Sequence, residues 1–344
     1  MTEETPFAFT GNNTIDGTIM SGLSNHTLEM LQSKMLQNVL PAIYLFIFIV
    51  STPLNVTSLW IFCRSQSKNP TMVFMINLTA NDLVYSLTLP FLAVYHLGGN
   101  NWPFGDVFCS VTIIMFYANV NCSILTMMCI SVERYVGIVH PLRFQKCMNI
   151  RKAFILCLLI WVLVLSIDIP LLYTKMTFYV HELNILTCFD ILPKNMFSSH
   201  VAFYLYFACR FLVFFVIPIV TMVICYLLII TTLLRSHIKQ STFSKKQTIY
   251  TIVVLLLVLL ICFVPNNVIL IAHSLPSNKQ YTLYVAYKLS LALSGFNCCL
   301  DPFVYYFGSK EFRQNVKSKM YFLFHKNNTD QTMKTHTSEV ITLS

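Results

Sequence analysis

The chain is short of charged residues, and this shortage excludes the most common class of protein. Of 344 residues only 11% are charged, whereas 56% are hydrophobic. Soluble domains carry roughly 25% charged residues, so a single water-soluble core is excluded. The sequence also lacks an internal repeat, which removes support for an inverted-repeat transporter. Residues 1–30 lack a basic segment followed by an apolar one, so we expect no cleavable signal peptide.

Long apolar runs are what the chain has instead. They cover approximately residues 39–63, 71–97, 107–132, 152–173, 200–234, 248–275 and 281–307. Each run is near or above the ~20 residues that a helix needs to cross a bilayer. We therefore predict an all-α membrane protein in which residues 39–308 form a bundle of seven transmembrane helices.

The charges predict the orientation of this bundle. Seventeen of the 23 Lys and Arg residues lie in the segments after the first, third, fifth and seventh runs or at the start of the fourth run. Only four of the 14 acidic residues lie there. By the positive-inside rule these segments are cytoplasmic, which places the N-terminus outside and the C-terminus inside. Because topology explains the net charge of +9, we expect no nucleic-acid partner.

The cysteines predict one disulfide. The chain has twelve cysteines, but only Cys109 and Cys188 fall on the predicted outer side. The other ten lie within runs or on the reducing side, where a small apolar packing role is expected. We therefore predict a Cys109–Cys188 disulfide between the top of the third helix and the loop that follows the fourth.

The two tails differ in composition. Residues 1–38 are polar and aperiodic, and their sequons predict an extracellular tail glycosylated at Asn12 and Asn25. Residues 309–324 place apolar side chains on one face and basic ones elsewhere, which predicts an amphipathic helix on the inner leaflet. Residues 325–344 are rich in Ser and Thr and predict a disordered cytoplasmic tail open to phosphorylation.

The third run joins an outer anchor to an inner charged group. Cys109 opens it, and Glu133-Arg134-Tyr135 closes it. The 25 residues from Cys109 to Arg134 span ~37 Å as a helix, about one membrane with part of its interface. This is a geometry suited to signalling across the bilayer.

Characteristic polar and proline residues mark every run in a fixed order. They are Asn55; Asn77-Leu78 with Asp82; Cys109 with Glu133-Arg134-Tyr135; Trp161; Pro218 with Tyr226; Phe263 with Pro265; and Asp301-Pro302 with Tyr305. One such motif is weak, but the full set resembles a rhodopsin-like (class A) G-protein-coupled receptor over residues ~40–325. Phe263, Asp301 and Cys188-Phe189-Asp190 resemble its purinoceptor and lysophospholipid-receptor branch.

The resemblance implies a plasma-membrane receptor with a switch at its inner end. Agonist binding would swing the sixth helix outward and free Arg134 to contact a heterotrimeric G protein of the Rho-activating or the inhibitory class. Arrestin and receptor kinases would act on the C-terminal tail. The residues assigned to the switch are Glu133, Arg134, Tyr135, Tyr226 and Tyr305. Those assigned to the activation kink are Phe263, Pro265 and Pro302.

The resemblance also implies a polar site inside the bundle. The matching residues are Asp82, Asn119, Ser123, Asn297 and Asp301. Two acids with neutral oxygens nearby could hold a sodium ion at Asp82 or share a proton. We expect no other cofactor. We also considered a structural hydrogen bond from Asn55 to Asp82.

Two cations inside apolar runs indicate the ligand. Lys288 and Arg210 are the basic residues well inside runs, and an intramembrane cation is costly unless it has a function. We therefore expect an anionic amphipathic ligand, either a lysophospholipid or another lipid conjugate, with free nucleotide second. Two alternatives stay open: Lys288 reaches the outer interface, and Arg210 pairs with Asp168. The predicted ligand-binding residues are Lys288, Arg210, Tyr117, His96, Tyr95 and His273.

Other functions have less support. A light-sensing opsin would need its retinal lysine at the position of Gly295. A transporter or channel moving a small anion, the main alternative, would be expected to show repeats or an acid-lined pore. A membrane hydrolase would need clustered ligands, whereas the nine His residues show no metal-ligand spacing within a run. We therefore expect no enzymatic activity.

Overall fold

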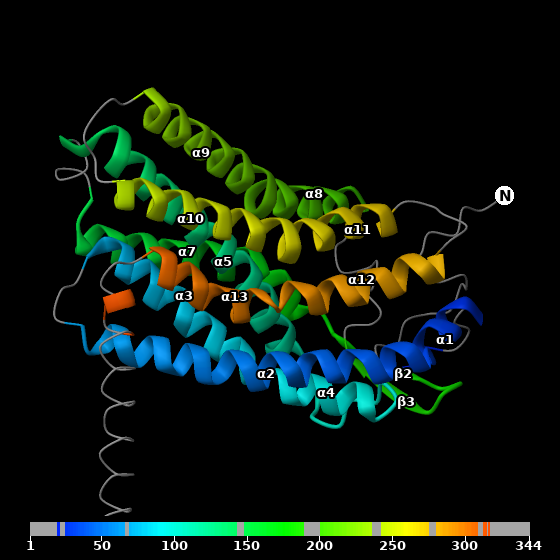
Figure 1. Ribbon diagram of the computed structural model, residues 1–344. Coiled ribbons are helices and arrows are strands. Elements are labelled where there is room, and N and C mark those ends of the chain that lie inside the picture. Colours follow the sequence, from blue (N-terminus) through cyan, green and yellow to red (C-terminus); the bar gives the residue numbers. More distant parts are fainter. Residues whose placement is uncertain are drawn as a thin grey trace, which may run out of the picture.

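The computed structural model is a helical bundle, as predicted (Figure 1). It describes residues 19–20, 25–65, 69–142, 148–188, 200–235, 242–274, 280–308, 312–314 and 316. Within these residues seven helical segments are long and apolar enough to cross a membrane. They are Lys34–Cys63, Pro70–Leu97, Asp106–Val139, Ile150–Leu171, Tyr204–Arg235, Ile249–Leu270 and Thr282–Tyr306, called spans one to seven below.

Three spans are single helices and four are interrupted. Spans one, three and four are α2 (Lys34–Cys63), α5 (Asp106–Val139) and α7 (Ile150–Tyr173). Span two consists of α3 (Pro70–Ser86) and α4 (Leu89–Leu97). Span five joins α8 (His200–Phe211) and α9 (Ile217–Arg235), span six joins α10 (Thr242–Val258) and α11 (Val264–Ser274), and span seven joins α12 (Gln280–Ser294) and α13 (Asn297–Gly308).

Proline accounts for most of the interruptions. Its ring lacks an N–H and collides with the carbonyl four residues earlier, so the helix widens or breaks before it. Span two breaks just before Pro90, and π-helical turns at Leu212–Val216 and Leu259–Phe263 precede Pro218 and Pro265. Span seven is the exception. Its break lies between Ser294 and Asn297, whereas Pro302, expected at a kink, lies inside α13.

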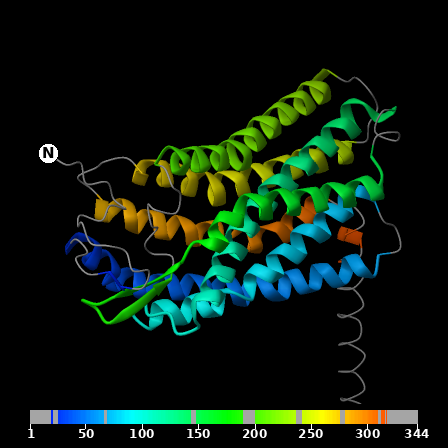
Figure 2. The same ribbon diagram turned by 180° about the vertical axis from the view of Figure 1, so that it is seen from behind.

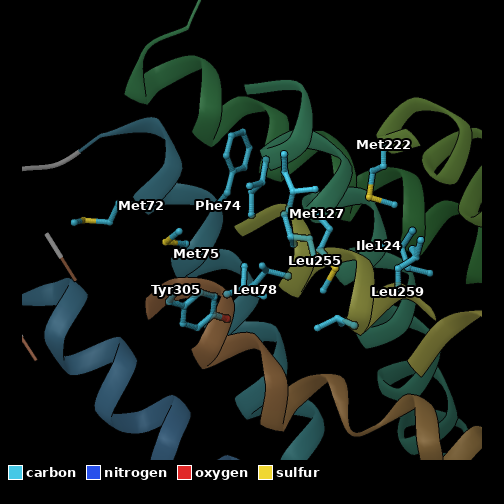
Figure 3. Close-up of a cluster of buried hydrophobic side chains, with 14 of the residues drawn as sticks. Met72, Phe74, Met75, Leu78, Ile124, Met127, Met222, Leu255, Leu259 and Tyr305 are labelled. Atoms are coloured by element: carbon cyan, nitrogen blue, oxygen red, sulfur yellow. The ribbon is translucent and has the colours of Figure 1, made fainter. Parts of the chain in front are cut away.

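Span three forms the centre of the bundle. Its most apolar stretch is 72% buried, against 28% for span four. Figure 3 shows how spans two, three, five, six and seven contribute to one apolar cluster around it. The labelled members of the cluster are Met72, Phe74, Met75, Leu78, Ile124, Met127, Met222, Leu255, Leu259 and Tyr305. Large apolar side chains of spans four and five, such as Val162 and Leu227, are exposed, as expected of helices that face lipid.

The outer end carries structure that the sequence did not predict. Strands β2 (Thr177–Val180) and β3 (Ile185–Cys188) form an antiparallel hairpin, and β1 (Ile19–Met20) pairs in parallel with β2. Helix α1 (Asn25–Leu31) lies beside this sheet at one end of the bundle (Figures 1 and 2). The prediction of an aperiodic tail through residue 38 is therefore wrong from residue 25 onward. Asn12, the side chain of Asn25, most of the expected surface helix at 309–324 and the tail at 325–344 lie outside the described residues.

Candidate ligand site and signalling switch

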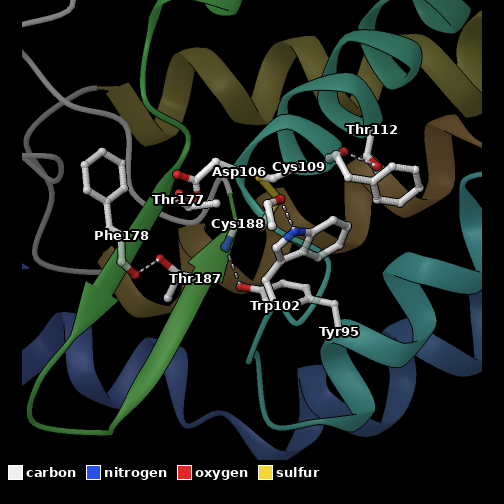
Figure 4. The surroundings of a disulfide bond; sticks show 11 residues. Tyr95, Trp102, Asp106, Cys109, Thr112, Thr177, Phe178, Thr187 and Cys188 are labelled. Atoms are coloured by element: carbon white, nitrogen blue, oxygen red, sulfur yellow. Dashed lines mark hydrogen bonds between the residues drawn. A yellow bond between two sulfur atoms is a disulfide. The ribbon is translucent and has the colours of Figure 1, made fainter. Parts of the chain in front are cut away.

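The predicted disulfide is present and anchors the outer hairpin. Cys109 at the top of α5 is bonded to Cys188 at the end of β3, with the two Cα atoms 5.9 Å apart. Figure 4 shows the aromatic side chains beside it. The Cys188 N–H donates to the Tyr95 hydroxyl at 3.2 Å, and the Trp102 indole donates to the Gly105 carbonyl at 2.9 Å. Tyr95 is 1% exposed. It therefore holds the disulfide loop in place, and its contact with ligand stays a prediction.

His96 has a similar structural position. Its Nδ1 lies 2.6 Å from Oδ1 of Asn100, and its ring stacks on Tyr44 of span one with centroids 5.9 Å apart. The Asn100 amide in turn donates to the Leu31 carbonyl at the end of α1 at 2.7 Å. His96 thus belongs to a network that fixes α1 against the bundle. The side chain of His273, also predicted to contact ligand, lies outside the described side chains.

Arg210 lies at the junction of spans three, four and five. It forms an ion pair with Asp168 of α7, which was the alternative left open above. The Arg210 side chain is 11% exposed and that of Asp168 is 1% exposed. The guanidinium carbon also lies over the ring of Tyr117, 4.5 Å from its centroid, a cation–π contact. The structure therefore brings Arg210 together with one predicted ligand residue, Tyr117.

Span seven contributes the second cation. Lys288 is 7% exposed, and its Nζ lies 5.7 Å from the centroid of Tyr284. The neighbouring Tyr287 side chain hydrogen-bonds with Tyr117, which links this part of span seven to the Arg210 cluster. Lys288 is thus enclosed by the protein rather than extended to the outer interface. The contact between Tyr117 and Tyr287 therefore joins the Arg210 cluster to span seven at the residue next to Lys288.

The five residues of the predicted interior site are all buried. The Asn119 amide donates to Asp82 at 3.1 Å, and the Asn297 amide donates to the Ser123 hydroxyl at 3.2 Å. Oδ2 of Asp82 and both carboxylate oxygens of Asp301 accept no hydrogen bond from the described residues. The site therefore brings the carboxyl groups of Asp82 and Asp301 close enough to interact, beside amide and hydroxyl groups of the neighbouring spans.

Asn55 does not form the bond to Asp82 that we considered. Its amide donates instead to the carbonyls of Ser51 at 3.0 Å and Cys298 at 2.8 Å, which ties span one to span seven. Asn77 links span two to its neighbours, since it accepts from the Trp161 indole at 2.9 Å and donates to Thr126 at 3.0 Å.

The inner end places the switch residues on three spans. Oε1 of Glu133 accepts from the Thr71 hydroxyl of span two at 2.5 Å. The Tyr226 hydroxyl of span five lies 2.6 Å from that of Ser131 on span three. Tyr305 of span seven is fully buried and its ring packs on Phe62. Tyr226 is thus engaged by span three, one turn above Arg134.

Sequence reasoning missed several polar partners at these sites. Asn81 donates to Ser123 at 3.2 Å, and the Cys298 thiol donates to Oδ1 of Asn119 at 3.8 Å. The Tyr206 hydroxyl donates to the Ile167 carbonyl at 2.9 Å and accepts from Arg210 at 3.3 Å. The signal that could have found Asn81 is its position next to Asp82 inside an apolar run, because a buried amide must face polar groups.

Comparison with known proteins identifies the family. Residues 54–305 match the family described as 7 transmembrane receptor (rhodopsin family). Metabotropic purinoceptor 8 of Gallus gallus is 42% identical over 296 residues, covering 86% of this chain and 83% of that receptor. The S-geranylgeranyl-glutathione receptor of Homo sapiens is 40% identical over 301 residues, with coverage of 86% and 83%. Proteinase-activated receptor 2 of Mus musculus is 37% identical over 305 residues, with coverage of 87% and 75%.

These matches confirm the resemblance drawn from the motifs, including its finer part. The runs at 74–78, 123–127, 262–267 and 299–307 resemble the eighth member of the metabotropic purinoceptor family. Membership of the family implies a multi-pass plasma-membrane protein that couples to G proteins and is not an enzyme. The chain belongs to the rhodopsin family of seven-transmembrane receptors, in the branch that includes metabotropic purinoceptors and proteinase-activated receptors.

Proposed function

We propose that this receptor binds an extracellular anionic amphipathic ligand of the lipid-conjugate class and then activates a heterotrimeric G protein. The observation that carries the proposal is the pair of enclosed cations, Lys288 and Arg210, inside spans seven and five. Burying a cation in a bundle costs several kcal/mol unless it meets an anion. The carboxylate or phosphate of a ligand can bind such cations through charge-assisted hydrogen bonds, and the surrounding aromatic side chains suit an apolar chain.

The relatives support a lipid conjugate. The human relative is named as a receptor for S-geranylgeranyl-glutathione. That molecule joins a long isoprenoid chain to a tripeptide with two carboxylates, which is the combination that enclosed cations and aromatic walls would select. The purinoceptor name of the avian relative keeps free nucleotide as the second candidate. Nothing in the matched family supports the transporter or channel alternative.

Activation by a trypsin-like proteinase has less support than a diffusible ligand. One relative is named as proteinase-activated. Trypsin-like proteinases hold a basic side chain in an acidic pocket before they cleave. Residues 1–33 of this chain contain no Lys or Arg, so such an enzyme would find no preferred bond within this segment.

We place the N-terminus outside the cell and the C-terminus inside. The Cys109–Cys188 disulfide lies at the same end of the bundle as α1 and the hairpin, and disulfides persist in oxidising compartments. The basic segments lie at the opposite end. There the receptor would couple to the Rho-activating or the inhibitory class of G protein, and arrestin and receptor kinases would act on residues 325–344.

The buried oxygens around Asp82 fit a sodium ion. Asp82 and Asp301 supply carboxylates, and Asn119, Ser123 and Asn297 line the same site. Buried charges of one sign are expected to be paired or to coordinate a cation. A bound ion would neutralise the two acids and hold spans two and seven together.

A nucleotide-exchange assay on purified receptor with a panel of G proteins tests the proposal. S-geranylgeranyl-glutathione, a lysophosphatidate and a nucleoside diphosphate serve as the three probes. We expect exchange with a lipid probe, and we expect Lys288→Gln to weaken its potency. A hydrogen bond to a charged group is worth about 1.5–3 kcal/mol, which corresponds to a roughly 10- to 150-fold loss.

Lys175→Gln is the matched control, because Lys175 is an exposed lysine outside the spans. It should leave potency unchanged. The proposal fails if no anionic lipid stimulates exchange, or if Lys288→Gln matches the control while surface expression is normal.

A further inference from the structure

The Arg210 cluster holds its own internal anion. We propose that Asp168 competes with the ligand's anionic group for Arg210, so that binding exchanges an intramolecular carboxylate for an extracellular one and releases the outer half of span five. This inference rests on the function proposed above and deepens it. It makes Asp168, which need not touch the ligand, a determinant of potency.

The geometry around Asp168 makes it a replaceable partner. Its Oδ1 is paired with Arg210, whereas its buried Oδ2 accepts no hydrogen bond from the described residues. A carboxylate that is 1% exposed and bonded through one oxygen is poorly compensated for its loss of water. An incoming carboxylate or phosphate with better access to Arg210 can therefore compete with it.

The same cluster connects α7 and α8. Backbone packing between these two helices is sparse in the described residues. Two side-chain bridges join them instead: the Arg210–Asp168 ion pair and the hydrogen bond from the Tyr206 hydroxyl to the Ile167 carbonyl at 2.9 Å. Arg210 also donates to the Tyr206 hydroxyl at 3.3 Å, so the two bridges share one cation. We call these four residues the α7–α8 latch.

The latch lies directly above a π-helical turn of span five. Arg210 is the penultimate residue of α8, and the π-helical turn Leu212–Val216 follows at once. Phe214 in that turn lies under the guanidinium, with its centroid 5.9 Å from the guanidinium carbon. π-helical turns are often found at functional sites. Removing Arg210 from Asp168 would therefore free α8 to shift relative to α7 at this turn.

Two variants separate competition from simple support. Asp168→Asn keeps the shape of the side chain and removes the competing charge. We expect it to raise the potency of S-geranylgeranyl-glutathione in nucleotide exchange by about tenfold, because the ligand no longer displaces an ion pair. The double variant Asp168→Asn with Arg210→Gln removes both charges, so that neither is left buried and unpaired. We expect its potency to fall below that of the wild type, since the cation that binds the ligand is gone.

The charge-swapped pair Asp168→Arg with Arg210→Asp is the third variant. This variant restores an ion pair but places a carboxylate at position 210, where the anionic group of the ligand would bind. We therefore expect ligand binding to be lost while surface expression persists. If the pair were only structural, the swap would restore wild-type potency and Asp168→Asn would never raise it. Either result would overturn the inference.

Hydrogen exchange of residues 200–211 in nanodiscs gives a readout that needs no ligand. We expect Asp168→Asn to accelerate exchange there about tenfold, because one of the two bridges is lost. Ser166→Ala is the matched control, since Ser166 is an exposed residue of α7 whose hydroxyl bonds only its own helix, at the Val162 carbonyl. A wild type that ignores every lipid probe would refute the proposed function alone. Unchanged exchange in Asp168→Asn would refute the latch.

Discussion

Gly295 lies in the break of span seven, and its missing side chain makes room for a buried tyrosine. A Cβ built at Gly295 would lie 2.9 Å from the Tyr85 hydroxyl oxygen and 3.3 Å from Cε1 of the same ring. Tyr85 is 1% exposed and packs against Phe116 with centroids 5.9 Å apart, so its ring has little room to retreat. Gly295→Ala must therefore displace Tyr85, α12 or both.

The loss of stability in Gly295→Ala can be estimated from the size of the overlap. Ordinary contact begins at 3.4 Å, so the tyrosine oxygen must move by half an ångström or more. Overpacking a closed core in this way costs about 1–3 kcal/mol. In a chain of this size that predicts a fall of roughly 2–6 °C in the melting temperature. The same overlap explains in physical terms why a retinal-bearing lysine would not fit at this position.

A thiol-reactive dye measures the melting temperature, because heating exposes the buried cysteines such as Cys298. Gly98→Ala is the matched control. A Cβ at Gly98 also meets a backbone carbonyl at 3.3 Å but meets no tyrosine side chain. We expect Gly98→Ala to melt close to the wild type and Tyr85→Phe, which removes the overlapping oxygen, to rescue Gly295→Ala. If Gly295→Ala melts like the wild type, or Tyr85→Phe gives no rescue, the packing argument is wrong.

Three further variants test contacts at the two ends of the bundle. Replacing Cys109 and Cys188 together by Ser should cost about 2–5 kcal/mol, measured by thermal melting, and melting at the wild-type temperature would contradict a stabilising role. Ser131→Ala removes the 2.6 Å bond to Tyr226 and should raise ligand-independent nucleotide exchange, whereas unchanged basal exchange would show that the bond restrains nothing. Asn100→Ala, at a residue with φ of 63°, should lose about 1–3 kcal/mol from strain and from the lost bond to α1, and proteolysis of the outer end should accelerate. Resistance equal to that of the wild type would refute that role.

The sequence predicted the spans and the disulfide for physical reasons that are local. A run of about 20 apolar residues can bury itself only in lipid, and two cysteines in an oxidising compartment tend to pair. Most of the helix breaks can also be predicted from local sequence, because Pro90, Pro218 and Pro265 lack the N–H donor that a helix needs. The break at Gly295 depends on the fit against Tyr85, which no single segment contains.

The outer sheet and helix α1 depend on contacts between distant segments. Leu31 of α1 packs against Val180 of β2, and a four-residue strand is not stable without such partners. The sequence of residues 25–38 therefore carries no sign of its own that distinguishes it from a tail. The cost of burying charge singled out Arg210 as a residue that needs a partner, but it could not choose between a ligand and Asp168, because both satisfy the same cation.

Span five contacts span three at two levels, and this makes it the part of the chain most able to connect ligand to switch. At the outer level Arg210 lies over Tyr117, and at the inner level Tyr226 bonds Ser131. Tyr226 follows Arg210 by 16 positions, which is about 24 Å along a helix, with the π-helical turn and Pro218 between them. A ligand that drew Arg210 from Asp168, as we propose, would act on the span that carries Tyr226, whereas a ligand contact at Lys288 would act on span seven. Contacts at both cations would thus act on two spans that bond to span three, and the Ser131–Tyr226 bond is the contact through which span five would transmit the effect toward Arg134.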